Sequence, residues 1–177
     1  MALNKARYIN AVIYFAHHAN NEHLGKVKLM KLLYYLDFDH FEKHGSSVTG
    51  DTYRKLDFGP VPLHGEAMLI QMSEEGLIKI DKVAVGDVQK YRYTPLKEFD
   101  ADALSPTEME ILADVACKWE HHTRAEIVSA AHGEAPWKAV AMGEEIPYEL
   151  AYYRNKYPAT ETIEDKEPNI TVEDAAA

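Results

Sequence analysis

Apolar residues recur at three- and four-residue steps over much of the chain, and this spacing predicts helices. In residues 4–19 the positions that follow it are Ile9, Val12, Ile13 and Ala16. In residues 26–44 a wider stripe combines aliphatic and aromatic side chains: Leu29, Leu32, Leu33, Tyr34, Tyr35, Leu36, Phe38 and Phe41. Such a stripe predicts a helix that contacts other elements on more than one side. Gly45 suits its end, because glycine accepts the left-handed conformation found there.

The pattern becomes polar over residues 46–55 and predicts a loop or a short extended segment,. Gly59-Pro60 predicts a turn,. Pro62 suits the first turn of a further helix that runs to about Glu75, since a proline there gives up no helical hydrogen bond. The region therefore connects two helices through a polar loop and a sharp change of direction.

Two short segments, residues 77–81 and 89–95, are rich in β-branched and aromatic residues and predict strands,. Gly86-Asp87 lies between them and predicts a turn. A helix that leads directly into a hairpin has a winged-helix-like order.

The second half of the chain carries two helix-start signals. Ser105 and Glu108, with Pro106 between them, form one capping box, and Thr123 and Glu126 form a second,. Shorter helical turns are expected at Pro136-Trp137 and from Ile146-Pro147-Tyr148 to about residue 155.

From Pro158 the chain is acidic, has no aromatic residue and shows no period,. We therefore expect one mainly helical α+β domain with a small β-hairpin over residues 1–157, and a disordered tail over residues 158–177. Ala175, Ala176 and Ala177 have the composition of a cloning scar and are left out of the fold prediction,.

The chain of 177 residues has a formal net charge of −10. That balance argues against a large nucleic-acid footprint and favours either a basic partner or a plain solvated surface. Cys117 is the one cysteine, so no internal disulfide is possible and a reducing, cytoplasmic compartment fits,. The first residues are too broken by polar positions for a signal peptide or a membrane span,.

Candidate chemistry is sparse. Asp37, His40 and His44 share one helix face and suit zinc, or else form a polar face opposite the leucines,. His121, His122 and His132 suit acid–base work near neutral pH, but no nucleophile lies at a helpful spacing, and His132 also suits a helix end,. Cys117 is expected to be a small buried hydrophobe. No coherent catalytic set emerges, so we predict a protein that is not an enzyme and has no cofactor or metal.

The polar segment before Pro60 is the better candidate for a functional surface, because it contains residue types that anchor protein interfaces beside a rigid Gly-Pro unit. The candidate partner-binding residues are Tyr53, Arg54, Asp57, Phe58 and Pro60. The alternative is that Tyr53 and Phe58 only cover the core. A second alternative is DNA binding by the hairpin, whose basic residues are Lys79, Lys82, Lys90 and Arg92.

An ordered set of short motifs resembles the Panacea domain, also called the SocA-like antitoxin domain. In the first half the matching residues are Leu32-Leu33-Tyr34-Tyr35, Gly45, Tyr53 and Gly59-Pro60-Val61. In the second half they are Glu126-Ile127-Val128-Ser129, His132, Pro136-Trp137, Gly143 and Ile146-Pro147. The resemblance covers roughly residues 24–155.

The resemblance implies a non-enzymatic antitoxin that neutralises a cognate toxin protein by direct binding. Members of the SocA type also present their toxin to an ATP-dependent protease as adaptors. The family offers no catalytic residues to transfer to this chain.

Overall fold

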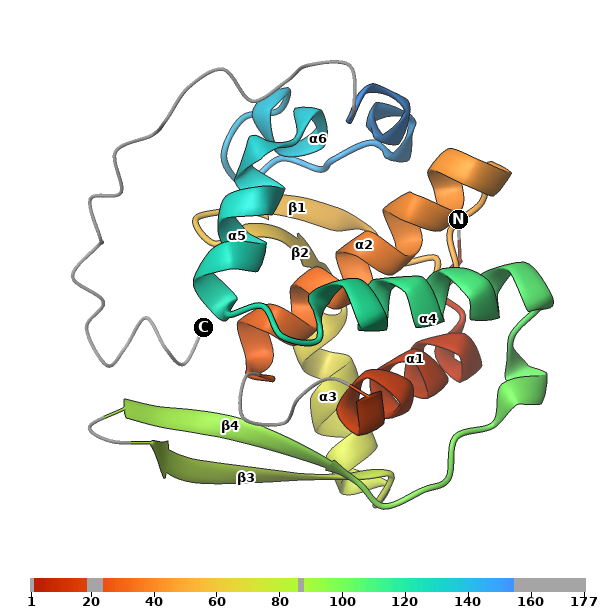
Figure 1. Ribbon diagram of the computed structural model, residues 1–177, viewed down its shortest axis with the longest axis vertical. Helices are drawn as coiled ribbons and strands as arrows, with labels where there is room; N and C mark the ends of the chain where they lie inside the picture. Colours follow the sequence, from red (N-terminus) through yellow and green to blue (C-terminus); the bar gives the residue numbers. More distant parts are fainter. Residues whose placement is uncertain (1, 19–23, 86–87, 155–177) are drawn as a thin grey trace.

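The central element is α2 (Lys26–His44), which is buried on nearly every side. The computed structural model describes residues 2–18, 24–85 and 88–154. Helices α1 (Lys5–His18), α4 (Pro106–Trp119) and α5 (Arg124–Gly133) all pack on α2, which crosses the middle of the molecule in Figure 1. The wide apolar stripe predicted for residues 26–44 is therefore confirmed.

Residues 53–62 form a β-hairpin that the sequence interpretation missed. Strand β1 (Tyr53–Leu56) pairs antiparallel with β2 (Gly59–Pro62). The turn predicted at Gly59-Pro60 falls instead on residues 57 and 58, and Pro62 ends β2 rather than starting a helix. Both of those predictions were wrong, and α3 begins later (Gly65–Glu74).

The prolines fit this hairpin because they lie where the β-ladder needs no donor. Pro60 is opposite Lys55 and Pro62 is opposite Tyr53. The N–H of Lys55 donates to Glu144 (3.0 Å) and the carbonyl of Tyr53 accepts from Ile146 (2.8 Å), so both groups point away from β2. Neither proline position exchanges a ladder bond, which is the condition under which strands tolerate proline.

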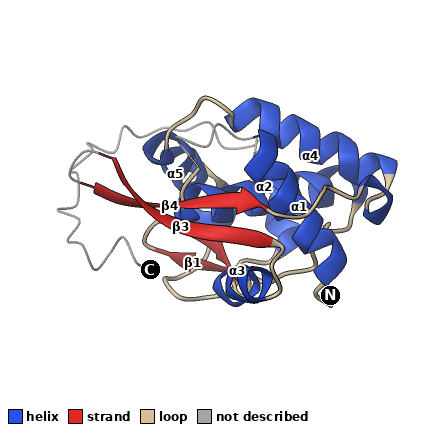
Figure 2. Cartoon of the chain, turned by 90° about the horizontal axis from the view of Figure 1, so that it is seen from below, coloured by secondary structure: helices blue, strands red, loops and turns tan. Residues whose placement is uncertain are grey.

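Helix α3 leads into a second hairpin, β3 (Ile78–Val85) and β4 (Val88–Pro95), as the winged-helix-like order predicted. The strands are longer than expected, and the predicted Gly86-Asp87 turn lies outside the described residues. This hairpin reaches away from the helices, while the β1–β2 pair lies behind α5 (Figures 1 and 2).

The predicted helix starts are confirmed in the second half. Both capping boxes are complete, with Ser105 and Glu108 opening α4 and Thr123 and Glu126 opening α5. The short elements are η1 (Ala101–Ala103), α6 (Ala135–Lys138) and η2 (Tyr148–Tyr153). The last one is a 3-10 helix.

The chain is thus a mainly helical α+β domain with two small antiparallel strand pairs. Within the residues described, no helix combines the length and apolarity needed to cross a membrane. The expected tail at residues 158–177 lies outside the described part of the chain.

Candidate partner-binding site

Tyr53 lies in the core, not on the surface. Its side chain is 0% exposed, and its hydroxyl donates to Oδ2 of the buried Asp37 at 2.8 Å. The aromatic ring packs edge-on against Tyr34 and Phe38. Of the two interpretations left open by the sequence, Tyr53 therefore takes the core role, and it offers no surface to a partner in this structure.

Asp37 is the hub of this buried polar cluster. It accepts from the N–H groups of Val48 (2.8 Å) and Thr49 (2.7 Å), from the Thr49 hydroxyl and from the phenols of Tyr53 and Tyr148. Burial raises the pKa of Asp37 to about 6, although these hydrogen bonds oppose the shift,. The carboxylate holds the loop before β1 against α2.

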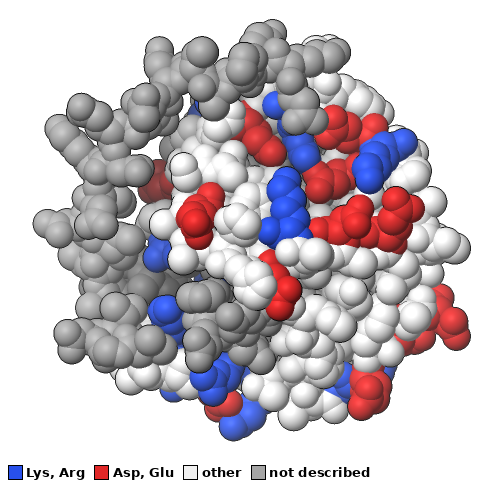
Figure 3. Space-filling view, viewed as in Figure 1, with Lys and Arg blue, Asp and Glu red and all other residues white. Residues whose placement is uncertain are grey.

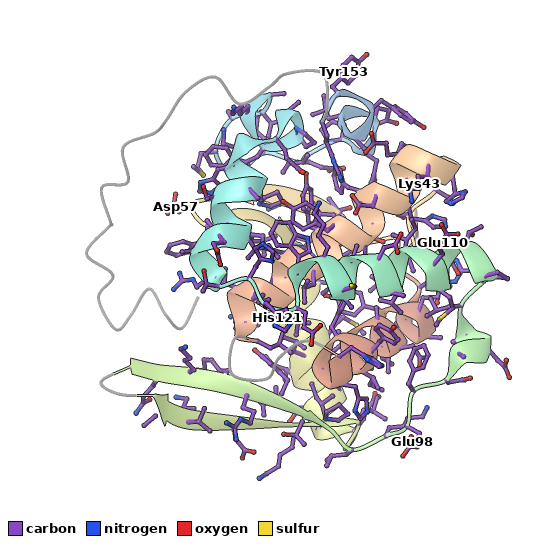
Figure 4. The ribbon with its side chains drawn as sticks, in the orientation of Figure 1. Lys43, Asp57, Glu98, Glu110, His121 and Tyr153 are labelled. Carbon is purple, nitrogen blue, oxygen red and sulfur yellow. The ribbon has the colours of Figure 1, made fainter. Side chains whose placement is uncertain are left out.

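The other candidate partner-binding residues differ in their exposure to solvent. Arg54 and Asp57 are exposed, Phe58 is half-buried and Pro60 is buried. Asp57 lies at the outer edge of the molecule beside α5 (Figure 4). The turn at residues 57 and 58 therefore presents Arg54, Asp57 and part of Phe58 to solvent.

Pro60 is held by a buried lysine that the sequence interpretation did not single out. Lys31 of α2 is 0% exposed, and its Nζ donates to the Pro60 carbonyl at 2.6 Å. A Cβ on Gly59 would lie 2.8 Å from Cε of Lys31, and Gly59 has a φ of +95°. Only glycine lets the strand approach the lysine so closely.

Helices α5 and α6 cover the same hairpin with a stack of side chains. The rings of His132 and Trp137 are parallel at 4.0 Å, and Nζ of Lys55 lies 4.1 Å from the centre of the indole. The indole N–H donates to the carbonyl of Leu56 at 3.3 Å. Beyond the turn, the guanidinium of Arg124 lies 4.5 Å above the ring of Phe58,.

Burial among like charges lowers the pKa values of the basic groups here. Desolvation is the main cause for Lys31, whose pKa falls to about 7, and Arg124 adds repulsion. The pKa of His132 is lowered by desolvation and then by Lys31, while a hydrogen bond to the backbone of Asp57 opposes the shift. The pKa of Arg124 is also lowered, by desolvation,.

The proposed metal ligands do not converge. The oxygens of Asp37 are occupied as described above, whereas His40 contacts the Ser46 carbonyl (2.6 Å) and the Thr107 hydroxyl (3.3 Å). His44 is exposed and packs against the His40 ring. In the described ranges, no group of three His, Cys, Asp or Glu side chains is placed to hold a metal ion.

The remaining sequence candidates lie apart from the turn. His121 is exposed beside Glu120, and His122 packs edge-on against Trp119. Cys117 is exposed, so the expectation of a buried cysteine was wrong. The physical reason is helical phase, because the buried stripe of α4 passes through Ala116 and Trp119 and leaves position 117 on the solvent side.

The basic residues of the β3–β4 hairpin are partly engaged within the hairpin. Lys79 pairs with Asp81 (2.9 Å), Arg92 lies opposite Asp81, and Lys82 lies over the ring of Tyr91. DNA binding by this hairpin stays a prediction, and among the described residues of the hairpin no contact specifically favours it.

Comparison with known proteins identifies the family. The family model described as Antitoxin SocA-like, Panacea domain, matches residues 29–138. The chain belongs to this antitoxin family. No match came from either the curated proteins or the solved structures. The residues that pack around the first hairpin, Lys31, Lys55, Arg124, His132 and Trp137, all lie inside the matched segment.

Three of the sequence motifs that resemble the Panacea domain come together in space. Gly59-Pro60, His132 and Trp137 meet over Lys31, although more than 70 residues separate the two halves. Lys31, Lys55 and Arg124 carry most of the local charge and were missed, because an isolated lysine or arginine gives no periodic signal. One local feature did suggest that Lys31 is buried, namely its position within the apolar stripe of α2.

Proposed function

We propose that this Panacea-domain chain neutralises a cognate toxin protein by direct binding, through the surface around the β1–β2 turn. Membership of the family supports an antitoxin role in general. The single observation that carries the finer proposal is that three of the motif segments, Gly59-Pro60, His132 and Trp137, lie together beside this one turn. We assign no catalytic residue and no cofactor to the chain.

The turn surface consists of residues that point to solvent around the hairpin end: Arg54, Leu56, Asp57, Phe58 and Met142. Leu56 is 43% exposed and Met142 is 54% exposed, both high for large apolar side chains,. The two lie close together, because the N–H of Gly143 donates to the carbonyl of Lys55 at 2.8 Å. Apolar groups beside charges are typical of the centre and rim of a protein interface.

The turn surface is also held in shape before any partner arrives. Lys31 fixes the Pro60 carbonyl, Trp137 fixes the Leu56 carbonyl, and Glu144 accepts from the backbone of Lys55. A surface that is ordered in the free protein loses less conformational entropy on binding. This rigidity supports a docking role for the hairpin end.

The test is co-expression of the chain with the product of the adjacent gene, followed by a pull-down and a growth assay. Direct neutralisation predicts restored growth together with a stoichiometric complex. Restored growth without a complex would contradict direct binding and point to degradation of the toxin. A host lacking its ATP-dependent proteases would then show whether the chain is a protease adaptor.

A further inference from the structure

Four basic side chains from three elements gather around the β1–β2 turn: Lys31, Lys55, Arg124 and His132. We call them the cationic cluster. No ion pair joins any of them to a carboxylate in the described part of the chain, whereas Arg7, Lys26, Lys43 and Arg154 all have acidic partners. Their partners are carbonyl oxygens and the faces of Phe58 and Trp137.

The position of Arg124 is electrostatically unfavourable. It is the first residue of α5, a helix of 10 residues, and the N-terminal end of a helix already carries partial positive charge. An acidic residue is the choice that would stabilise this position. The fold instead places a half-buried guanidinium there, in Coulombic contact with the buried Lys31.

Two acids lie beside the cluster, Glu126 in the first turn of α5 and Asp57 on the hairpin turn. Asp57 is exposed, and its charge raises the pKa of His132 by less than the charge of Lys31 or of Lys55 lowers it. Its side chain lies at the molecular edge beside α5 in Figure 4. Lys55 and Arg124 therefore supply most of the positive charge at the hairpin end at neutral pH, because the pKa values of Lys31 and His132 are lowered, and the exposed apolar groups Leu56 and Met142 lie beside this end.

A second region of the surface differs in charge. Near the end of α2, Asp39 and Glu42 surround Arg154, and Asp114 of α4 lies beside Lys43. Figure 3 shows acidic and basic side chains intermixed over the face of the molecule that it presents. The net charge of −10 thus describes the whole chain. At contact distance the charges near the interface determine the attraction between two proteins, because salt screens charges that lie more than about 8 Å apart.

We propose that the toxin presents an Asp or Glu carboxylate, flanked by apolar side chains, to the cationic cluster. This inference rests on the proposed function and fixes the chemistry of the partner at that site. It reverses the expectation from overall charge, which favoured a basic partner. The carboxylate would meet Arg124 and Lys55, which lie over the rings of Phe58 and Trp137, and Arg124 is already half-buried.

A charge series on the full chain, with the co-purified product of the adjacent gene as partner, tests the sign of the interaction. Arg124→Glu should weaken the complex at least about tenfold. Asp57→Asn should strengthen it severalfold by removing a like charge. Lys97→Glu is the matched control and should leave affinity unchanged, since Lys97 is exposed and adjoins Glu98, which lies far from Asp57 in Figure 4.

We expect Arg124→Glu to fold, because glutamate at the start of α5 favours the helix, and circular dichroism melts of each variant check this. Weaker binding by Asp57→Asn with stronger binding by Arg124→Glu would overturn the proposal and identify a basic partner. Unchanged affinity for Arg124→Glu in an intact complex overturns the proposal alone. Absence of any wild-type complex is instead a failure of the proposed function.

A chemical test locates the carboxylate itself. In Arg124→Lys, a carbodiimide should join the new amine to a toxin Asp or Glu, and mass spectrometry would identify that residue. The same treatment of Lys97 should give no such link. If Arg124→Glu abolishes binding to a labelled single-stranded oligonucleotide but not to the toxin, the cluster binds phosphate and the proposal is wrong.

Discussion

The side-chain amine of Lys31 and the carbonyl oxygen of Pro60 are 2.6 Å apart, in a place that water does not reach. The bond joins the central helix to the first hairpin. It meets no carboxylate, so the lysine gains a hydrogen bond but no neutralising charge. A charged amine without a neutralising partner is costly to bury. We infer that the bond is kept because it fixes the position of the hairpin on α2.

Stability should depend on the protonation of Lys31. Folding lowers its pKa from 10.5 to about 7, so between these values the unfolded state binds more protons than the folded state. Stability from this group therefore rises as the pH increases from 7 to 9, at most by about 1.4 kcal/mol per pH unit. Urea unfolding at several pH values should show a steeper rise in wild type than in Lys31→Met.

The same comparison has a second expected outcome. At pH 9 the wild-type amine is mostly neutral and keeps its bond, so Lys31→Met should be less stable by about 1–3 kcal/mol, the cost of an unsatisfied buried acceptor. The difference should shrink towards pH 7. Equal slopes in the two proteins would show that Lys31 stays charged in the folded state.

Gly59→Ala should destabilise the domain by about 1–3 kcal/mol, because the residue has φ +95° and its new Cβ would lie 2.8 Å from Lys31,. Gly133→Ala is the matched control. A Cβ there meets nothing within 4 Å, and the residue ends α5. Chemical unfolding of both variants should show a loss only for Gly59→Ala, and similar values would contradict the steric account.

Asp37→Ala should cost about 3 kcal/mol or more, because two backbone N–H groups lose their acceptor and each orphaned donor costs about 1–3 kcal/mol,. Asp37→Asn should be milder, since its amide oxygen still accepts those bonds while the hydroxyls of Thr49 and Tyr53 turn to accept from the amide. Urea unfolding at pH 7 measures both. An equal loss in the two variants would mean that the charge itself is required.

The pH dependence of Asp37 has a defined sign. Folding raises its pKa from 3.8 to about 6, so the folded state binds more protons between these values. This contribution favours the folded state below pH 4 and is lost as the pH rises through 6. The stability difference between wild type and Asp37→Asn should therefore shift in favour of wild type on acidification from pH 7 to pH 5.

Tyr53 and Phe58 should respond differently to truncation. Tyr53→Ala should lower the free energy of unfolding by about 3–5 kcal/mol, as for other large core residues, and leave the affinity of the folded fraction for toxin intact. Phe58→Ala should lower affinity with a smaller loss of stability, because Phe58 is only half-buried beneath Arg124. Thermal melts with binding titrations separate the two, and loss of affinity alone in Tyr53→Ala would place Tyr53 in the interface.

Periodicity in the sequence was enough to predict the helices, because each helix depends on spacing and caps within a few residues. Ser105 with Glu108 and Thr123 with Glu126 were readable for this reason, and so was the order of α3 and the second hairpin. The first hairpin was missed because proline normally disfavours strands. Its tolerance of Pro60 and Pro62 depends on residues 143–146, about 80 residues away.

The sequence by itself determined the mainly helical fold, the resemblance to Panacea antitoxins and the general position of the candidate surface. Only the tertiary structure decided which side chains of that surface are free. Tyr53 is buried because Asp37 and Tyr148, 111 residues apart, meet beside it, and Lys31 meets Pro60 because α2 passes under the hairpin. Whether a polar group is buried depends on hydrogen-bond partners that are distant in the chain, and the local sequence pattern does not indicate those partners.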